Sequence, residues 1–144
     1  MNGWKLGGEL YLPTLAAAES KYALPADLLA RVAFQECSWR EEVINYTVKS
    51  STGAMGILQL EPRFFPGVGG GWKSDIPIGA AELERLHAHY ADWQLAIAAY
   101  NWGEGDVDRW DAQGGQFAKL PVQTQNYVTQ VFGDVPVVGS VINV

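Results

Sequence analysis

The sequence contains one cysteine, few basic residues and no long apolar run. The lone Cys37 excludes an internal disulfide and a cysteine-rich metal site, and we expect it to be a small, half-buried apolar side chain. Ten lysines and arginines against sixteen acidic residues give a net charge of −6, and no basic stripe that would favour nucleic acid is present. No apolar run approaches the roughly 20 residues of a membrane helix. We therefore expect a monomer with no nucleic-acid partner and no membrane anchor.

The length and composition are those of one globular domain. A chain of 144 residues with 48% hydrophobic residues can bury about two-thirds of its unfolded surface. We predict a single domain over residues 1–144, with an irregular, glycine-rich segment at 1–12 and a tail at 134–144. Residues 1–8 hold neither an apolar core segment nor a lipid-attachment cysteine, so we expect no secretion signal.

Apolar periodicity and helix-boundary residues predict a mainly α fold without internal repeats. The expected helices run from Pro13 to about Tyr22, from Pro25 to about Trp39, from about Ile78 to Tyr90 after Pro77, from the N-cap Asp92 to the stop at Gly103, over a short turn at 106–110, and from Pro121 to about Phe132. Polar residues at 41–49 and prolines and glycines at 62–71 predict loops. The β-branched tail, 135–144, is open to three interpretations: a strand, a clasp across the domain, or a contact with another chain.

Glu36 places a carboxylate on the apolar face of the second predicted helix. It continues an i, i+3, i+4, i+7 stripe that also holds Leu29, Val32 and Ala33. Burial would disfavour the charged form and raise the pKa of Glu36, which would keep the acid protonated near neutral pH. The structural alternative is a helix-end residue that reaches water or pairs with Arg40.

A polar loop with two glycines, residues 50–59, follows this helix and ends in Gln59. An acid beside such a loop predicts a site that protonates a bound ligand. Glycosidases normally use two carboxylates, and no other acid shares the placement of Glu36. Glu61 and Asp75 stay open as a second group that positions a water molecule.

The histidines and aromatic residues are less informative. His87 and His89 are two residues apart on a helix, so they point to different faces, and with no third ligand evident we expect no metal site. Six tryptophans and six tyrosines exceed the needs of a small core, and stacking on sugar rings is one use for the surplus. The helical spacing of Trp93 favours a place in the core, whereas Tyr100 fits either role.

Five segments resemble motifs of the soluble lytic transglycosylase domain, glycoside hydrolase family 23, which is related to goose-type lysozyme. They are QECSW at 35–39, SSTGAMGILQLEP at 50–62, DIPIG at 75–79, AAYNWG at 98–103 and TQNYV at 124–128. The family patterns that they resemble are Glu-Ser-x-aromatic, Ser-x-x-Gly-Ala-x-Gly-Leu-Met-Gln-x-x-Pro, Asn-Ile-x-x-Gly, Ala-Ala-Tyr-Asn-Ala-Gly and Glu-Thr-x-x-Tyr-Val. Their order along the chain implies a single lysozyme-like helical domain with a catalytic groove.

The resemblance implies a peptidoglycan lytic transglycosylase that needs no cofactor and no metal. Glu36 would be the catalytic acid and then the base at the β-1,4 bond between N-acetylmuramic acid and N-acetylglucosamine, giving 1,6-anhydromuramoyl products. The groove would hold the peptidoglycan strand through Ser50, Gln59, Tyr100, Asn101 and Tyr127. Four positions depart from the family pattern: Cys37, Glu61, Trp102 and Gln123.

Two other functions stay open on the sequence alone. A goose-type muramidase on the same fold would hydrolyse the bond with a positioned water, and a non-catalytic wall-binding module would keep the groove without turnover. A signal-free lytic domain is typical of a phage lysin or a virion component, and a trimmed bacterial enzyme or a secretion-system accessory would have the same sequence features. We favour the phage lysin. We therefore expect synthesis in the host cytoplasm and action on the periplasmic cell wall.

Overall fold

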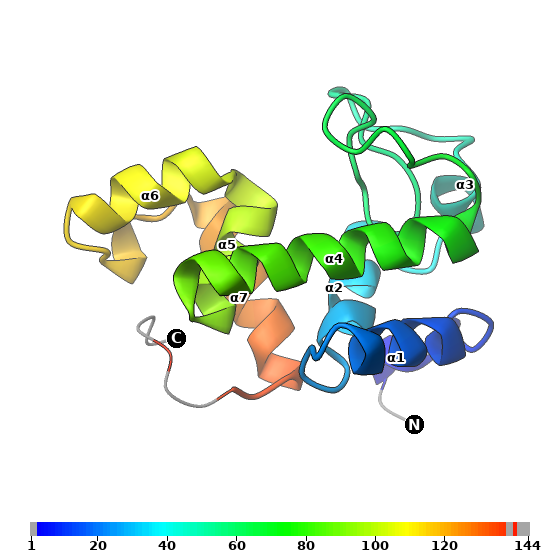
Figure 1. Ribbon diagram of the computed structural model, residues 1–144, viewed down its shortest axis with the longest axis horizontal. Helices are drawn as coiled ribbons and strands as arrows, with labels where there is room; N and C mark the ends of the chain where they lie inside the picture. Colours follow the sequence, from blue (N-terminus) through cyan, green and yellow to red (C-terminus); the bar gives the residue numbers. More distant parts are fainter. Residues whose placement is uncertain (1–2, 138–139, 141–144) are drawn as a thin grey trace. The chain divides into compact units, whose positions relative to one another are not determined.

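The computed structural model describes residues 3–137 and residue 140, and its regular structure is helical (Figure 1). The α-helices lie at Leu12–Lys21 (α1), Leu28–Cys37 (α2), Glu41–Ile44 (α3), Trp72–Tyr90 (α4), Trp93–Trp102 (α5), Glu104–Ala112 (α6) and Val122–Asp134 (α7). Two 3₁₀ segments lie at Gly3–Lys5 (η1) and Phe117–Lys119 (η2). Within the described ranges, β pairing is limited to an isolated bridge between Met55 and Leu60. The predicted mainly α fold is confirmed.

The chain divides into two compact units, Met1–Glu82 and Leu83–Val144, and the boundary falls inside α4. The first unit holds α1, α2, α3 and the start of α4, and the second holds the end of α4 together with α5, α6 and α7. The single domain over residues 1–144 stays a prediction. None of the helices in the described ranges has both the length and the hydropathy to cross a membrane.

In the first unit, α1 packs against α2 (Figure 1). Pro13 stands in the first turn of α1, as predicted, because an N–H group there would have no intrahelical partner. Leu15 from α1 and Leu28 from α2 are both 0% exposed and lie in the core. The helix α2 is shorter at both ends than predicted, since Asp27 and Ser38 adopt left-handed backbone conformations with φ of 70° and 51°.

The predicted polar loop at 41–49 contains one helical turn, α3. Its apolar pair explains the difference, because Val43 and Ile44 are 7% and 2% exposed and the turn directs them into the core. The predicted irregular segment at 1–12 likewise contains the short η1 and the first residue of α1.

The helix α4 begins at Trp72, well before the predicted start near Ile78, and Pro77 lies inside it. The carbonyl of Gly71 accepts the N–H groups of Ser74 at 3.0 Å and Asp75 at 2.9 Å, and these bonds start the helix upstream of the proline. Pro77 removes one intrahelical hydrogen bond near the N-terminus, which the remaining turns of a long helix tolerate.

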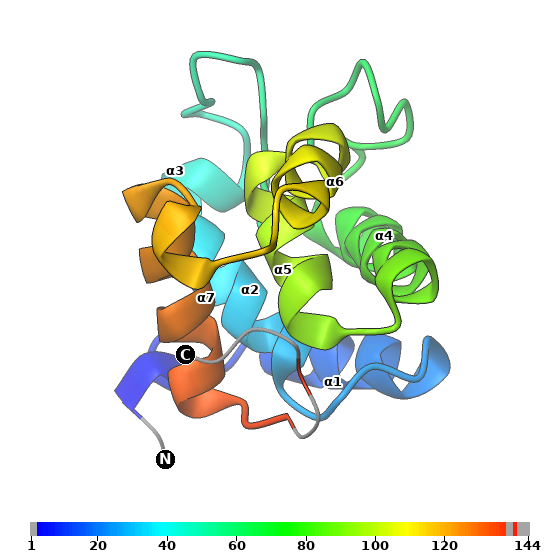
Figure 2. The same cartoon turned by 90° about the vertical axis from the view of Figure 1, so that its left-hand side faces the viewer.

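In the second unit, α5 packs against α6 and α7 (Figure 2). Asp92 caps α5 as predicted, with its Oδ1 accepting the N–H of Leu95 at 2.9 Å, and Gly103 ends the helix. The short turn expected at 106–110 is the longer helix α6. Trp93 is half-buried and stacks on His87 with 3.8 Å between ring centroids, so its predicted place in the core is wrong.

The tail begins inside α7, since Asp134 is still helical. Val135 is buried, and residues 135–137 form no strand. The hydroxyl of Ser140 donates to both carboxylate oxygens of Asp92 at 3.0 and 3.1 Å. This contact joins the tail to the start of α5, as expected if the tail is a clasp. The other tail residues, 138–139 and 141–144, lie outside the described residues, so the three interpretations of those positions stay predictions.

Candidate active site

Glu36 lies in the last turn of α2 and is half-buried. The apolar members of its stripe are each 0% exposed, which confirms the predicted buried face: Leu29, Val32 and Ala33. Arg40, its partner in the structural alternative, directs its guanidinium to Glu42 with 2.8 Å between Nη2 and Oε1. Glu36 therefore lies half-buried at the end of a helix face whose apolar members belong to the core of the first unit.

The end of α2 is held against the N-terminal segment by Trp39. The indole Nε1 of Trp39 donates to the carbonyl of Trp4 at 2.7 Å, and its ring stacks on Tyr11 with 6.0 Å between centroids. Gly8 makes the close approach possible, because a Cβ at this position would lie 2.5 Å from the Trp39 ring. These contacts fix the backbone directly after Glu36.

Cys37, the neighbour of Glu36, is fully buried rather than half-buried, with 2% of its surface exposed. Burial raises the pKa of its thiol to about 12, and the charge of Glu36 acts in the same direction. A neutral thiol is a weak nucleophile. Cys37 is therefore an apolar packing residue beside the candidate acid.

Ser50 and Gln59 each close a tight turn of the first unit. The Oγ of Ser50 accepts the N–H of Ala54 at 2.9 Å. The side-chain Nε2 of Gln59 donates to the carbonyl of Gly56 at 2.9 Å, and the backbone of Gln59 is left-handed with φ of 51°. Contact of either side chain with a glycan stays a prediction.

Asp75 is 1% exposed, and both of its carboxylate oxygens are hydrogen-bonded inside the first unit. Its Oδ2 accepts the hydroxyl of Tyr46 at 2.5 Å and its Oδ1 accepts the N–H of Gly69 at 3.0 Å. The first turn of α4 also favours an anion. Asp75 is thus structural, and of the two open candidates for positioning a water only Glu61, half-buried and 3.6 Å from Arg63, keeps an accessible carboxylate.

The structure brings together two of the segments predicted to bind glycan in the second unit. Tyr100 and Asn101 lie in the last turn of α5 and are half-buried, and Tyr127 lies on α7 and is 5% exposed. Thr124, also on α7 and 2% exposed, donates its hydroxyl to the Oδ1 of Asn101 at 2.8 Å. Sequence reasoning missed Thr124 as the residue that orients Asn101, although both belong to family motifs.

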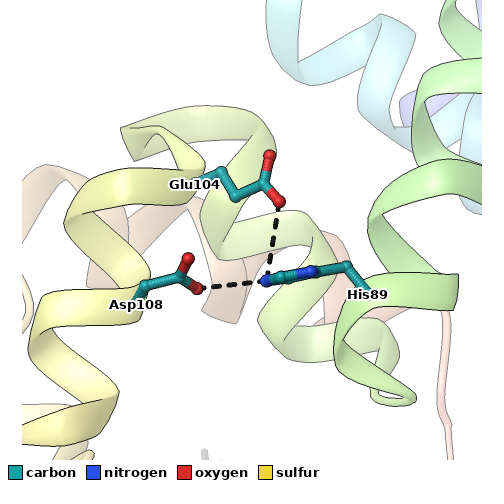
Figure 3. Close-up of side chains that lie close together, drawn as sticks. All are labelled: His89, Glu104 and Asp108. Atoms are coloured by element: carbon teal, nitrogen blue, oxygen red, sulfur yellow. Dashed lines mark hydrogen bonds and ion pairs between the residues drawn. The ribbon is translucent and has the colours of Figure 1, made fainter.

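His89 approaches two carboxylates of α6, as Figure 3 shows. Its Nε2 lies 3.5 Å from Glu104 and 3.3 Å from Asp108, and one ligand atom from each of the three residues falls within 4.8 Å of the others. The carboxylates have further partners, since Arg85 lies 3.1 Å from Glu104 and Tyr90 donates to Asp108 at 2.8 Å. The arrangement is an exposed ion-pair cluster whose atoms could geometrically hold a cation. Sequence reasoning missed it because His89 lies on α4 and both acids lie on α6, and Asp108 is 19 positions from His89 in the sequence.

Comparison with known proteins identifies the family. The family profile described as the transglycosylase SLT domain matches residues 13–69 and 72–122. The chain therefore belongs to the transglycosylase SLT domain family, and the predicted family resemblance is confirmed. The fifth motif, at 124–128, lies beyond the matched residues, so the predicted role of Tyr127 depends on the resemblance alone.

A curated relative and two solved structures support this assignment. The membrane-bound lytic murein transglycosylase F 2 of Alkalilimnicola ehrlichii is 35% identical over 101 residues, which are 62% of this chain and 21% of that protein. The chain thus spans about one fifth of the length of the relative. The lytic transglycosylase Slt from Pseudomonas aeruginosa, an inactive mutant, has a TM-score of 0.69 at 22% identity over 85% of this chain and 22% of its own. The 70 kDa soluble lytic transglycosylase Slt70 from Escherichia coli has the same TM-score at 24% identity over 85% and 23%. At these identities the likeness shows the fold.

Proposed function

We propose that this chain is a peptidoglycan lytic transglycosylase domain in which Glu36 is the catalytic acid and base. The observation that carries the proposal is the place of Glu36, half-buried in the last turn of α2 on a face whose other members are fully buried. Membership of the SLT domain family supports the same reaction. The hydrogen bonds of Asp75 support a mechanism with one carboxyl group, because both of its carboxylate oxygens accept hydrogen bonds from Tyr46 and Gly69.

The proposed reaction uses the same carboxyl group twice. Protonated Glu36 donates its proton to the glycosidic oxygen as the bond from that oxygen to C1 of N-acetylmuramic acid breaks. The muramoyl 2-acetamido group stabilises the developing cation, which is the substrate-assisted variant of glycoside cleavage. The Glu36 carboxylate then removes the proton of the muramoyl 6-hydroxyl, whose oxygen bonds to C1 and closes the 1,6-anhydro ring. No water is consumed.

The binding residues of this proposal are polar or aromatic groups that match the chemistry of a glycan. Amides and hydroxyls exchange hydrogen bonds with sugar hydroxyl and acetamido groups, and aromatic faces stack on sugar rings. We assign this role to Ser50, Gln59, Tyr100, Asn101 and Tyr127. Asn101 is oriented for it by Thr124, because the hydrogen bond to its Oδ1 leaves the amide N–H groups to face a ligand.

A muropeptide digest tests the proposal. Wild-type protein should release 1,6-anhydro ends from purified peptidoglycan, detected by mass spectrometry as products lighter by one water. Glu36→Gln keeps the shape of the side chain but removes the titrating proton, so we expect a loss of turnover of about 10²-fold or more. Equal clearing of wall turbidity by both proteins, or by neither, would refute catalysis by Glu36.

A goose-type muramidase is the second candidate, and Glu61 is the observation in its favour. Glu61 is half-buried in the loop that follows Gln59, and the exposed Arg63 lies 3.6 Å from its carboxylate. A carboxylate there could position water for hydrolysis. Reducing ends that disappear in Glu61→Gln would establish the hydrolase, whereas anhydro ends in both proteins would exclude it.

A further inference from the structure

We propose that half-buried Tyr46 and buried Asp75 form a hydrogen-bonded pair that positions the side chain of Gln59 for glycan binding. This inference rests on the proposed function, since that function gives Gln59 its ligand. The residues involved lie on three segments of the first unit: the chain after α3, the 55–60 turn, and the junction of the 62–71 loop with α4.

The hydroxyl of Tyr46 and both carboxylate oxygens of Asp75 form hydrogen bonds. The hydroxyl of Tyr46 donates to Asp75 at 2.5 Å and accepts the N–H of Gly71 at 2.8 Å. The other oxygen of Asp75 accepts the N–H of Gly69 at 3.0 Å. Burial raises the pKa of Tyr46 to about 12, and the bond to Asp75 adds to the effect, so the hydroxyl keeps the proton that it donates. A pair whose hydrogen bonds are all formed defines one geometry for the segments attached to it.

The 55–60 turn lies directly on this pair at Gly56. A Cβ at Gly56 would lie 2.7 Å from Oδ2 of Asp75 and 3.0 Å from Cε1 of Tyr46, and the φ of Gly56 is 83°. Only glycine allows both the contact and this backbone conformation. The peptide of Gly56 is therefore placed by the pair beneath it.

Gly56 in turn holds both the backbone and the side chain of Gln59. The carbonyl of Gly56 accepts both the backbone N–H of Gln59 at 3.2 Å and its side-chain Nε2 at 2.9 Å. Met55 and Leu60 close the turn with reciprocal N–H to carbonyl bonds of 3.1 Å. With its Nε2 held in this way, the Gln59 amide has a defined direction before any ligand arrives. Preorganised groups bind more tightly because no ordering cost is added on binding.

A double-mutant cycle on glycan binding tests the inference. The full chain carrying Glu36→Gln is titrated with soluble peptidoglycan glycan strands, so that binding is measured without turnover. Gln59→Ala should weaken binding about fivefold, and Tyr46→Phe, which keeps the ring against Gly56 but removes the hydroxyl, about threefold. In the double variant we expect no weakening beyond that of Gln59→Ala, because Tyr46 acts through Gln59.

Other outcomes of the cycle overturn the inference. Effects of Tyr46→Phe and Gln59→Ala that multiply would show that Tyr46 acts independently, and an unaltered affinity in Gln59→Ala would remove the glycan contact. If Tyr46→Phe does not fold, Asp75→Asn replaces it in the cycle with Gln59→Ala. Thermal melting checks that each variant is folded. Glu19→Gln is the matched control, a buried hydrogen-bonded acid of the same unit without a link to Gln59. It should leave the affinity unchanged, whatever its effect on the melting temperature at the pH of the titration.

The proposed function is measured separately. Wild-type chain with Glu36 intact is assayed for anhydro ends, and their absence would end the transglycosylase proposal. The binding cycle would still give its own answer, because it needs no turnover. Anhydro ends together with multiplying effects would instead keep the reaction and overturn the positioning role.

Discussion

Glu19 of α1 caps the first turn of α2 by accepting the backbone N–H of Ala30. The carboxylate makes this bond at 3.0 Å through Oε2 and accepts the N–H of Asp27 at 2.9 Å through Oε1. Asp27 itself was predicted in the first turn of the helix, but its side chain forms an ion pair with Lys5 at 2.9 Å and caps nothing. Since α2 presents Glu36 in its last turn, a residue of the neighbouring helix fixes the start of the element that carries the candidate acid.

The cap predicts a pH dependence of stability. Burial raises the pKa of Glu19 above its usual value, although the N–H groups of Ala30 and Asp27 oppose the shift. A raised folded-state pKa means that the stabilising contribution is complete below the unfolded pKa and is lost as the pH rises through the folded value. The stability of wild type relative to Glu19→Gln should therefore fall as the pH rises above about 4, the usual pKa of a glutamate, measured by thermal melting.

Glu42→Gln supplies the control of opposite sign. The side chain of Glu42 is 45% exposed, and hydrogen bonds from its own backbone and from Arg40 lower its pKa. Its contribution is present above the unfolded pKa and lost on acidification. Wild type relative to Glu42→Gln should thus gain stability, or stay level, over the range in which the Glu19 difference falls. A flat Glu19 difference would show that the buried carboxylate does not titrate as described.

Cys37 should be inert in the native protein. Burial holds the pKa of its thiol at about 12, so the thiolate fraction near pH 8 is negligible, and 2% exposure blocks access. We expect an aromatic disulfide reagent to label less than about a tenth of the native chain in the time that labels all of the denatured chain. Rapid stoichiometric labelling of native protein would contradict the burial of this residue beside Glu36.

Thr124→Val should leave the Asn101 side chain less well oriented, because valine has nearly the shape of threonine but lacks its hydroxyl. The variant removes the 2.8 Å hydrogen bond to Oδ1 of Asn101 from a site that is 2% exposed. We expect a loss of about 1 kcal/mol in the free energy of unfolding and weaker glycan binding. Thr129→Val is the matched control, because Thr129 lies on the same helix and is exposed. Equal affinities for the two variants would show that Asn101 needs no orientation from α7.

Local signals account for the parts of the fold that the sequence predicted. Pro13 starts α1, and Asp92 and Gly103 bound α5, because capping and stopping depend on residues within one turn of the helix end. The start of α4 was misplaced since Pro77 normally marks a first turn. Its true start depends on the carbonyl of Gly71 and on the burial of Asp75, which no local pattern contains.

The candidate site divides in the same way. The stripe of α2 is periodic, so it identified Glu36 and its buried neighbours from sequence. The supports of the site are pairings of distant residues: Tyr46 with Asp75 across 29 positions, and Asn101 with Thr124 across 23. Such pairs leave no periodic trace. Only the folded chain shows that Asp75, open as a second catalytic group from sequence, is bonded to the interior.

Gly79→Ala should destabilise the first unit, although alanine is the better helix former. Gly79 lies in α4 directly on Leu58, which is 0% exposed; a Cβ would overlap Leu58 Cδ1 and lie 3.3 Å from its Cγ. Alanine gains about 1 kcal/mol in helix propensity, but overpacking a filled core costs about 1–3 kcal/mol, so the clash decides the sign. Gly133→Ala in α7 is the control that separates helix propensity from the steric clash. No atom lies within 4 Å of the added Cβ, so only the gain in helix propensity remains. Chemical denaturation should therefore shift the two midpoints in opposite directions, and a stabilised Gly79→Ala would mean that α4 and Leu58 are not in the contact described.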